Sequence, residues 1–149
     1  MKAVVFDLSG TLLDVREGRY QLIAGADELL PILKRLGLKL IAFAPNDATG
    51  VTYLQHFGVD RHFHTVIAEQ PQEGTSHSEG LASLLQDMNV APHETVVVGN
   101  SVANIQLGKS VHSAKVIGIS YELNNAQALL DAGADHIVTD IAAVLDVLE

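Results

Sequence analysis

Short apolar runs alternate with amphipathic segments along the whole chain. The runs cover residues 2–6, 38–44, 64–68, 95–98, 116–120 and 137–139. The segments predicted as helices cover residues 27–35, 47–57, 79–88, 101–109, 126–132 and 141–148. Strands that are apolar throughout and joined by helices are typical of a parallel sheet covered on both faces. The pattern predicts one α/β domain over residues 1–149, a Rossmann-like three-layer α/β/α sandwich with a central parallel sheet.

Charge and composition exclude several classes of function. The chain has a net charge of −9 and no cysteine. An acidic surface repels phosphate backbones, so we expect no nucleic-acid partner. Without cysteine there are no disulfides, thiolate zinc sites or cysteine nucleophile. No apolar run approaches the ~20 residues of a membrane span. We therefore expect a cytoplasmic protein with no membrane partner.

Polar residues follow three of the predicted strands. Asp7 comes directly after the first run, Asn46 follows the second, and Asn100 with Ser101 follows the run at residues 95–98. The carboxyl ends of parallel strands meet at one edge of the sheet, where such folds bind ligands. Strands also end in polar turn residues for structural reasons alone. The pattern nevertheless predicts that the three positions converge on one site.

Four motifs in this order resemble those of the haloacid dehalogenase superfamily. The segment Asp7-Leu8-Ser9-Gly10-Thr11-Leu12 is similar to the family's first motif, Asp-x-Asp-Gly-Thr-Leu. The later matches are Ala44-Pro45-Asn46 to the second motif, Val97-Val98-Gly99-Asn100-Ser101 to the fourth motif, and Ala134-Asp135-His136-Ile137 to the usual ending. The order and spacing cover nearly the whole chain, so the resemblance implies a HAD-like fold.

The resemblance also implies a phosphatase site that uses magnesium. In the family an aspartate attacks phosphorus, a carboxylate two residues later acts as acid and then base, and Mg²⁺ and a lysine neutralise the phosphoryl oxygens. Carried over, the catalytic positions are Asp7 and Ser9, and the metal positions are Asp7, Ser9 through its carbonyl oxygen, and Asn100. The substrate-binding positions are Leu8, Gly10, Asn46, Thr75, Ser76 and His77.

Most of these positions lack the family's chemistry. Ser9 replaces the acid/base carboxylate, and its hydroxyl does not titrate near neutral pH. Pro45 replaces a hydroxyl residue, and the lysine position falls at Thr75 or Ser76. The fourth-motif acids are replaced by Asn100 and by Asn104, and amide oxygens hold Mg²⁺ less well than carboxylates.

These replacements leave a structural interpretation open beside the functional one. Asn100 and Asn104 are as well explained by hydrogen bonds to a turn and a helix as by metal binding. Asp7 is also compatible with a turn or capping role, although the family match favours an ancestral nucleophile. His77 could donate to an anion when protonated, but a solvated loop histidine explains it more simply.

We therefore predict a catalytically impaired or inactive phosphatase-like protein with a binding or regulatory role, and weak Mg²⁺ binding. The alternative is an active magnesium-dependent phosphohydrolase. A dehalogenase is disfavoured because its lysine and cap residues are missing, and a receiver-like phosphoacceptor because its acidic pair and late lysine are missing. The intervals between the motifs leave room for a short flap but no cap domain. The expected partner is a protein or a small phosphorylated ligand, and a homo-oligomer could close the open site.

Overall fold

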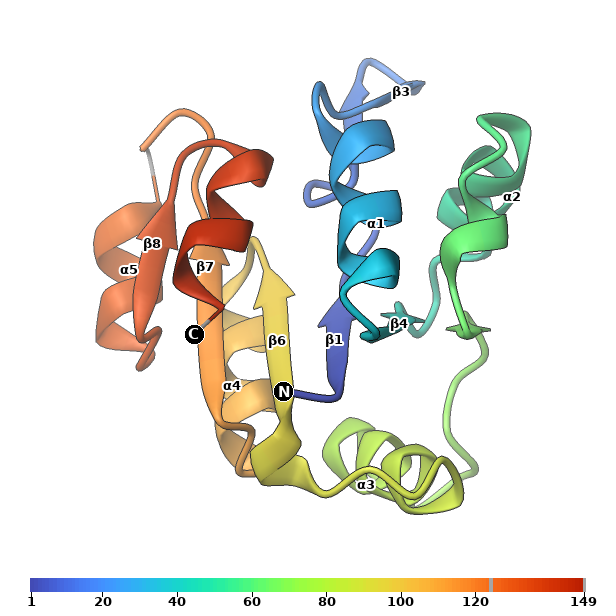
Figure 1. The fold of residues 1–149 in the computed structure, drawn as a ribbon, viewed down its shortest axis with the longest axis vertical. Helices are drawn as coiled ribbons and strands as arrows, with labels where there is room; N and C mark the ends of the chain where they lie inside the picture. Colours follow the sequence, from blue (N-terminus) through green and yellow to red (C-terminus); the bar gives the residue numbers. More distant parts are fainter. Residues whose placement is uncertain (124, 149) are drawn as a thin grey trace.

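The fold is built on one parallel six-stranded sheet (Figure 1). The computed structural model describes residues 1–123 and 125–148. The sheet order is β5-β4-β1-β6-β7-β8, and each neighbouring pair is parallel. The strands are β1 (Ala3–Phe6), β4 (Lys39–Phe43), β5 (Thr65–Ile67), β6 (Thr95–Gly99), β7 (Lys115–Ile119) and β8 (His136–Val138). This sheet confirms the predicted α/β class.

Helices cover both faces of the sheet. They are α1 (Ala26–Arg35), α2 (Ala48–His56), α3 (His77–Asp87), α4 (Val102–Ser110) and α5 (Ala126–Asp131), with 3₁₀ turns η1 (Asp60–His62), η2 (Pro92–Glu94) and η3 (Ile141–Val147). Successive side chains of a strand point to opposite faces. Val4 and Phe6 accordingly join the core beneath α1 and η3, while Ala3 and Val5 join the core beneath α3. The chain is therefore a three-layer sandwich.

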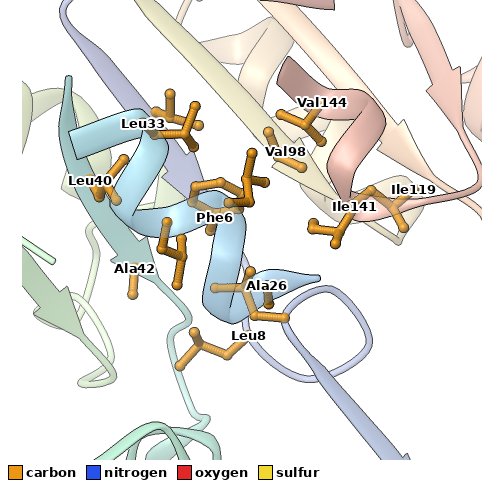
Figure 2. Packing of buried hydrophobic residues seen from close by; sticks show 14 of the residues in the cluster. Phe6, Leu8, Ala26, Leu33, Leu40, Ala42, Val98, Ile119, Ile141 and Val144 are labelled. Atoms are coloured by element: carbon orange, nitrogen blue, oxygen red, sulfur yellow. The ribbon is translucent and has the colours of Figure 1, made fainter. Parts of the chain in front are cut away.

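Figure 2 shows the larger core, in which Phe6 lies among side chains from α1 and the strands beside it. Phe6, Leu33 and Leu40 are 0–1% exposed. Burying side chains of this size contributes about 1.5–3 kcal/mol each. The loop after β1 belongs to the same core, because Leu8 and Leu12 are also 0% exposed. Packing therefore fixes the backbone on which Asp7 sits.

An antiparallel hairpin stands beyond the carboxyl end of β1 (Figure 1). It consists of β2 (Leu13–Arg16) and β3 (Arg19–Leu22). Between β1 and α1 the described residues hold only this hairpin and its connections. It corresponds to the short flap that the sequence predicts in this interval.

The predicted elements match the observed ones to within one or two residues, with two informative differences. Helix α3 begins at His77 and not at residue 79, because Ser76 caps it through a reciprocal bond with Glu79. His77 therefore opens a helix and does not lie in a loop. The last predicted helix is the 3₁₀ segment η3. Among the described residues, no helix has the length and apolar character needed to cross a membrane.

Strand order places the candidate site. Along the chain, strands are added on one side of β1 from β4 to β5, and then on its other side from β6 to β8. A sheet of this kind binds ligands where the order reverses, beyond the carboxyl ends of the strands. Asp7, Asn46 and Asn100 follow the adjacent strands β1, β4 and β6. The three positions therefore lie at one edge of the sheet, as predicted, but they do not share a cavity, because Asp7 and Asn100 line different ones and Asn46 lines neither.

Candidate functional site

Asp7 lies at the end of β1 and lines a cavity of about 420 Å³. Its N–H donates to the carbonyl oxygen of Val98 at 3.2 Å, which ties it to β6. Burial raises the pKa of its carboxyl to about 6, against the lowering effect of a hydrogen bond from the Leu8 backbone, and the charge of Asp47 raises it further. A buried carboxylate normally has a cation or several donors beside it. Burial among protein groups is therefore the main cause of the raised pKa of Asp7.

The remaining walls of this cavity come from the end of β4 and from α3 and α4. They are Phe43, Ala44, Pro45, Ser76, His77, Ser78, Ala103, Asn104, Gln106, Leu107 and Ser110. No lysine or arginine is among these described lining residues, and His77 is the one side chain there that can gain a positive charge. Ser76 and His77 thus lie beside Asp7, as the sequence predicts, but the cavity holds no permanent cation.

The segment at the family's lysine position, residues 75–77, forms the N-terminus of α3. The Ser76 hydroxyl accepts a hydrogen bond from the Glu79 N–H at 3.1 Å. The His77 Nε2 bonds the Gln70 Oε1 at 3.1 Å. Thr75 is exposed and does not line the cavity. Of the three substrate-binding positions predicted in this segment, only Ser76 and His77 line the cavity of Asp7.

Ser9 is held by a carboxylate that the sequence did not single out. The Ser9 hydroxyl donates to Oδ2 of Asp47 at 2.7 Å, and the Ser9 N–H donates to the same oxygen at 3.2 Å. The other oxygen of Asp47 accepts the Gly50 N–H at 2.9 Å and caps α2. Ser9 does not line the cavity of Asp7. Its hydroxyl proton is directed to Asp47 and not to Asp7.

Asn100 is used to hold the loop after β1. Its Oδ1 accepts from the Thr11 hydroxyl at 3.3 Å, and Thr11 is 0% exposed. Its amide nitrogen packs so closely on Gly10 that a Cβ built there would be 2.1 Å away. Gly10 has a φ of 88°, which only glycine adopts readily. Asn100 and Gly10 line a separate cavity of about 220 Å³ on this side of the loop.

The side chains that replace the family's fourth-motif acids are neutral amides that already accept hydrogen bonds. The Asn100 oxygen already accepts from Thr11, and the Asn104 Oδ1 accepts the N–H groups of Asn100 and Ser101, both at 3.2 Å. No cluster of three histidine or acidic side chains suited to a metal occurs in residues 1–123 and 125–148. Mg²⁺ prefers several anionic oxygens. The two asparagines make the turn and helix hydrogen bonds that the structural interpretation expects of them.

Two other predicted substrate-binding positions, Leu8 and Asn46, place no side chain in the cavity of Asp7. Leu8 is 0% exposed, so its side chain belongs to the core and cannot touch a ligand. Asn46 is exposed, has a φ of 70°, and donates its N–H to the Ala68 carbonyl at 2.8 Å. Pro45, and not Asn46, lines the cavity of Asp7.

Sequence reasoning missed Asp47 and also Tyr121, whose hydroxyl donates to the Thr11 carbonyl oxygen. The one sequence signal for Asp47 was its place as an acidic cap at the start of a helix.

Comparisons with known proteins agree with this fold. A curated phosphorylated carbohydrates phosphatase of Thermotoga maritima is 27% identical over 116 residues, which are 76% of this chain and 54% of that protein. The chain spans between a half and two thirds of the length of the curated relatives that it matches. A haloacid dehalogenase-like family protein of Streptococcus pneumoniae superposes with a TM-score of 0.85 at 14% identity, covering 100% of this chain and 99% of that one. A HAD-superfamily hydrolase of Geobacter sulfurreducens gives a TM-score of 0.77 at 15% identity, covering 99% and 100%.

The family model for haloacid dehalogenase-like hydrolases matches residues 15–112, more than half of the chain. The matched part includes strands β4, β5 and β6 and most of the cavity wall, whereas β1 and the Asp7 loop precede it. With the parallel sheet and the strand-end aspartate in place, this match establishes that the chain belongs to the haloacid dehalogenase-like hydrolase family.

Proposed function

We propose that this protein is a catalytically impaired HAD phosphatase that keeps Asp7 at a site for a small phosphorylated ligand. The observation that carries the proposal is the cavity of Asp7, whose described walls include no lysine or arginine. Phosphoryl transfer is catalysed almost entirely by positioning and by stabilising negative charge. A cavity that places a carboxylate among neutral groups can receive a ligand but does little to stabilise the transition state.

The remaining groups support the same proposal. Attack on phosphorus by the Asp7 carboxylate forms the aspartyl-phosphate and expels the leaving group, which then needs a proton. The Ser9 hydroxyl is too weak an acid to supply that proton at neutral pH, and it is bonded to Asp47. Losing acid/base help alone typically lowers a rate by about 10²–10⁴-fold. Members of the family generally use Mg²⁺, but the oxygens of Asn100 and Asn104 are already engaged in hydrogen bonds. We therefore propose weak Mg²⁺ binding.

The second candidate is an active phosphohydrolase. It is favoured by the curated relative in Thermotoga maritima, whose name is that of a phosphatase acting on phosphorylated carbohydrates. Under this candidate the ligand of Asp7 is a sugar phosphate and turnover is efficient despite the neutral cavity. The hydroxyl and amide groups of Ser78, Ser110 and Gln106 in the cavity wall are compatible with such a ligand.

Turnover of phosphate esters separates the two candidates. The purified protein, with Mg²⁺ present, is compared with Asp7→Asn and with the Thermotoga maritima phosphatase as a positive control. We expect a kcat/KM about 10²–10⁴-fold below the positive control or lower, from the missing acid/base group alone. Rates that equal the positive control and disappear in Asp7→Asn would show that the protein is an active phosphohydrolase. Asp87→Asn, at the far end of α3, controls for the change in net charge.

A further inference from the structure

The carboxylate of Asp47 occupies two hydrogen-bond donors of the nucleophile loop, defined here as residues 8–12. The Ser9 N–H and hydroxyl both point at Oδ2 of Asp47, at 3.2 and 2.7 Å. Asp47 lies 38 residues further along the chain, so the contact is tertiary and not a local turn. Hydrogen bonds to an ionised acceptor are roughly twice as strong as neutral ones. These donors are therefore already satisfied by an anion that belongs to the protein.

Asp47 also changes the electrostatics around Asp7. Its charge adds to the rise in the pKa of Asp7, so the two carboxylates act on each other. No lysine or arginine among the described residues lines the cavity to offset them. A phosphate in the cavity would meet the charge of Asp7 with no lysine or arginine in the described walls, while Asp47 lies outside those walls and holds the two Ser9 donors toward itself.

We propose that Asp47 determines which charge of ligand this site accepts: it is an internal anion that holds the Ser9 donors and disfavours phosphate. The inference rests on the proposed function in one respect, that the ligand of the site is a phosphoryl compound beside Asp7. The inference goes beyond the proposed function because it names Asp47 as the residue that limits the affinity of the site for anions.

A purely structural role for Asp47 makes a different prediction. One carboxylate oxygen caps α2 by accepting the Gly50 N–H, and the other is the one bonded to Ser9. Asparagine is as good an N-cap as aspartate. In Asp47→Asn the amide oxygen keeps the cap, while the NH₂ group that then faces Ser9 cannot accept from it. This single variant keeps the helix start, removes the charge and frees both donors.

The test is the affinity for inorganic phosphate, followed by NMR at the Ser9 amide at constant ionic strength and without metal. A unit charge removed several ångströms from an anion near a protein surface changes affinity by about tenfold. We expect phosphate to bind Asp47→Asn at least about tenfold more tightly than the wild type, with the Ser9 amide resonance moving during the titration. Asp87→Asn, which changes net charge equally at an exposed position, should bind phosphate as the wild type does.

An unchanged affinity in a folded Asp47→Asn overturns the inference, as does an equal gain in Asp87→Asn. Should Asp47→Asn not fold, Asp47→Ser gives the same test because serine also caps helices. The measurement is independent of turnover. Tighter phosphate binding without turnover supports the role of Asp47 and shows that no catalysis survives. Efficient turnover with unchanged phosphate affinity rejects the role of Asp47 and the proposed impairment together.

Discussion

The nucleophile loop is held differently on its two sides. Toward α2, Ser9 bonds the charged carboxylate of Asp47. Toward β6 and β7, Thr11 bonds the neutral groups of Asn100 and Tyr121. Burial, more than the nearby charges of Asp140 and Asp14, raises the pKa of Tyr121, so its hydroxyl stays a donor. The neutral side holds the loop through uncharged hydrogen-bonding groups, whereas the charged side disfavours anions in the role proposed for Asp47.

The neutral side depends on close contact between Gly10 and Asn100, and Gly10→Ala breaks it. A methyl group at residue 10 would be 2.1 Å from the Asn100 amide nitrogen, at a φ of 88°. Positive φ costs a non-glycine residue about 1–2 kcal/mol, and overpacking adds about 1–3 kcal/mol. We expect the free energy of unfolding to fall by about 3 kcal/mol, measured by urea denaturation.

Gly18 provides the matched control for this substitution. It has a similar positive φ of 74° in the hairpin turn, but a Cβ there meets nothing within 4 Å. Gly18→Ala should therefore cost about 1–2 kcal/mol, from backbone strain alone. Equal losses in the two variants would mean that the packing of Asn100 on Gly10 contributes nothing to the neutral side of the loop.

The sequence predicts the sheet far better than it predicts these contacts. Apolar runs such as residues 95–98 bury both faces of a strand, and this local signal identifies each strand of the parallel sheet but not its neighbours. The same signal placed Asp7 and Asn100 at strand ends on one edge of the sheet. The bond from Ser9 to Asp47 has no such signal, because it depends on how α2 settles against the loop. Likewise Asn100 could be assigned to a metal or to a turn until the position of Thr11 was known.

The stability of the chain should also depend on pH through the buried carboxyl of Asp7, and Asp7→Asn removes that charge. The pKa of Asp7 is about 6 in the folded chain, above its ordinary 3.8. The folded state then binds more protons between these values, so the stabilisation is complete below about pH 4 and is lost as the pH rises through 6. Asparagine has no charge to bury. We expect Asp7→Asn to be more stable than the wild type by about 1–3 kcal/mol at pH 7, at about 1.4 kcal/mol per pH unit of pKa difference.

Urea denaturation of both proteins at pH 4 and pH 7 checks this expectation. The difference between them should become small at the lower pH, where Asp7 is protonated in the folded state and partly protonated in the unfolded chain. A difference that does not depend on pH would show that burial of the Asp7 charge is not what sets the stability of this loop. Asp87→Asn is exposed and should show no comparable pH-dependent gain.

Asn100→Asp turns the neutral side into a charged one and tests whether it limits metal binding. The new carboxylate can still accept from the Thr11 hydroxyl, and it faces the loop of Asp7 across adjacent strands. Asn125 bonds the backbone oxygen of residue 100, so that contact survives the change. A second carboxylate supplies the anionic oxygen that Mg²⁺ prefers. Calorimetry should show Mg²⁺ binding at least about tenfold tighter than in the wild type, or about 1.4 kcal/mol.

Asn89→Asp, exposed after α3, adds the same charge elsewhere and should leave Mg²⁺ affinity unchanged. Micromolar Mg²⁺ binding by the wild type, or no gain in Asn100→Asp, would show that the neutral amide at residue 100 is not what limits metal binding on this side of the loop.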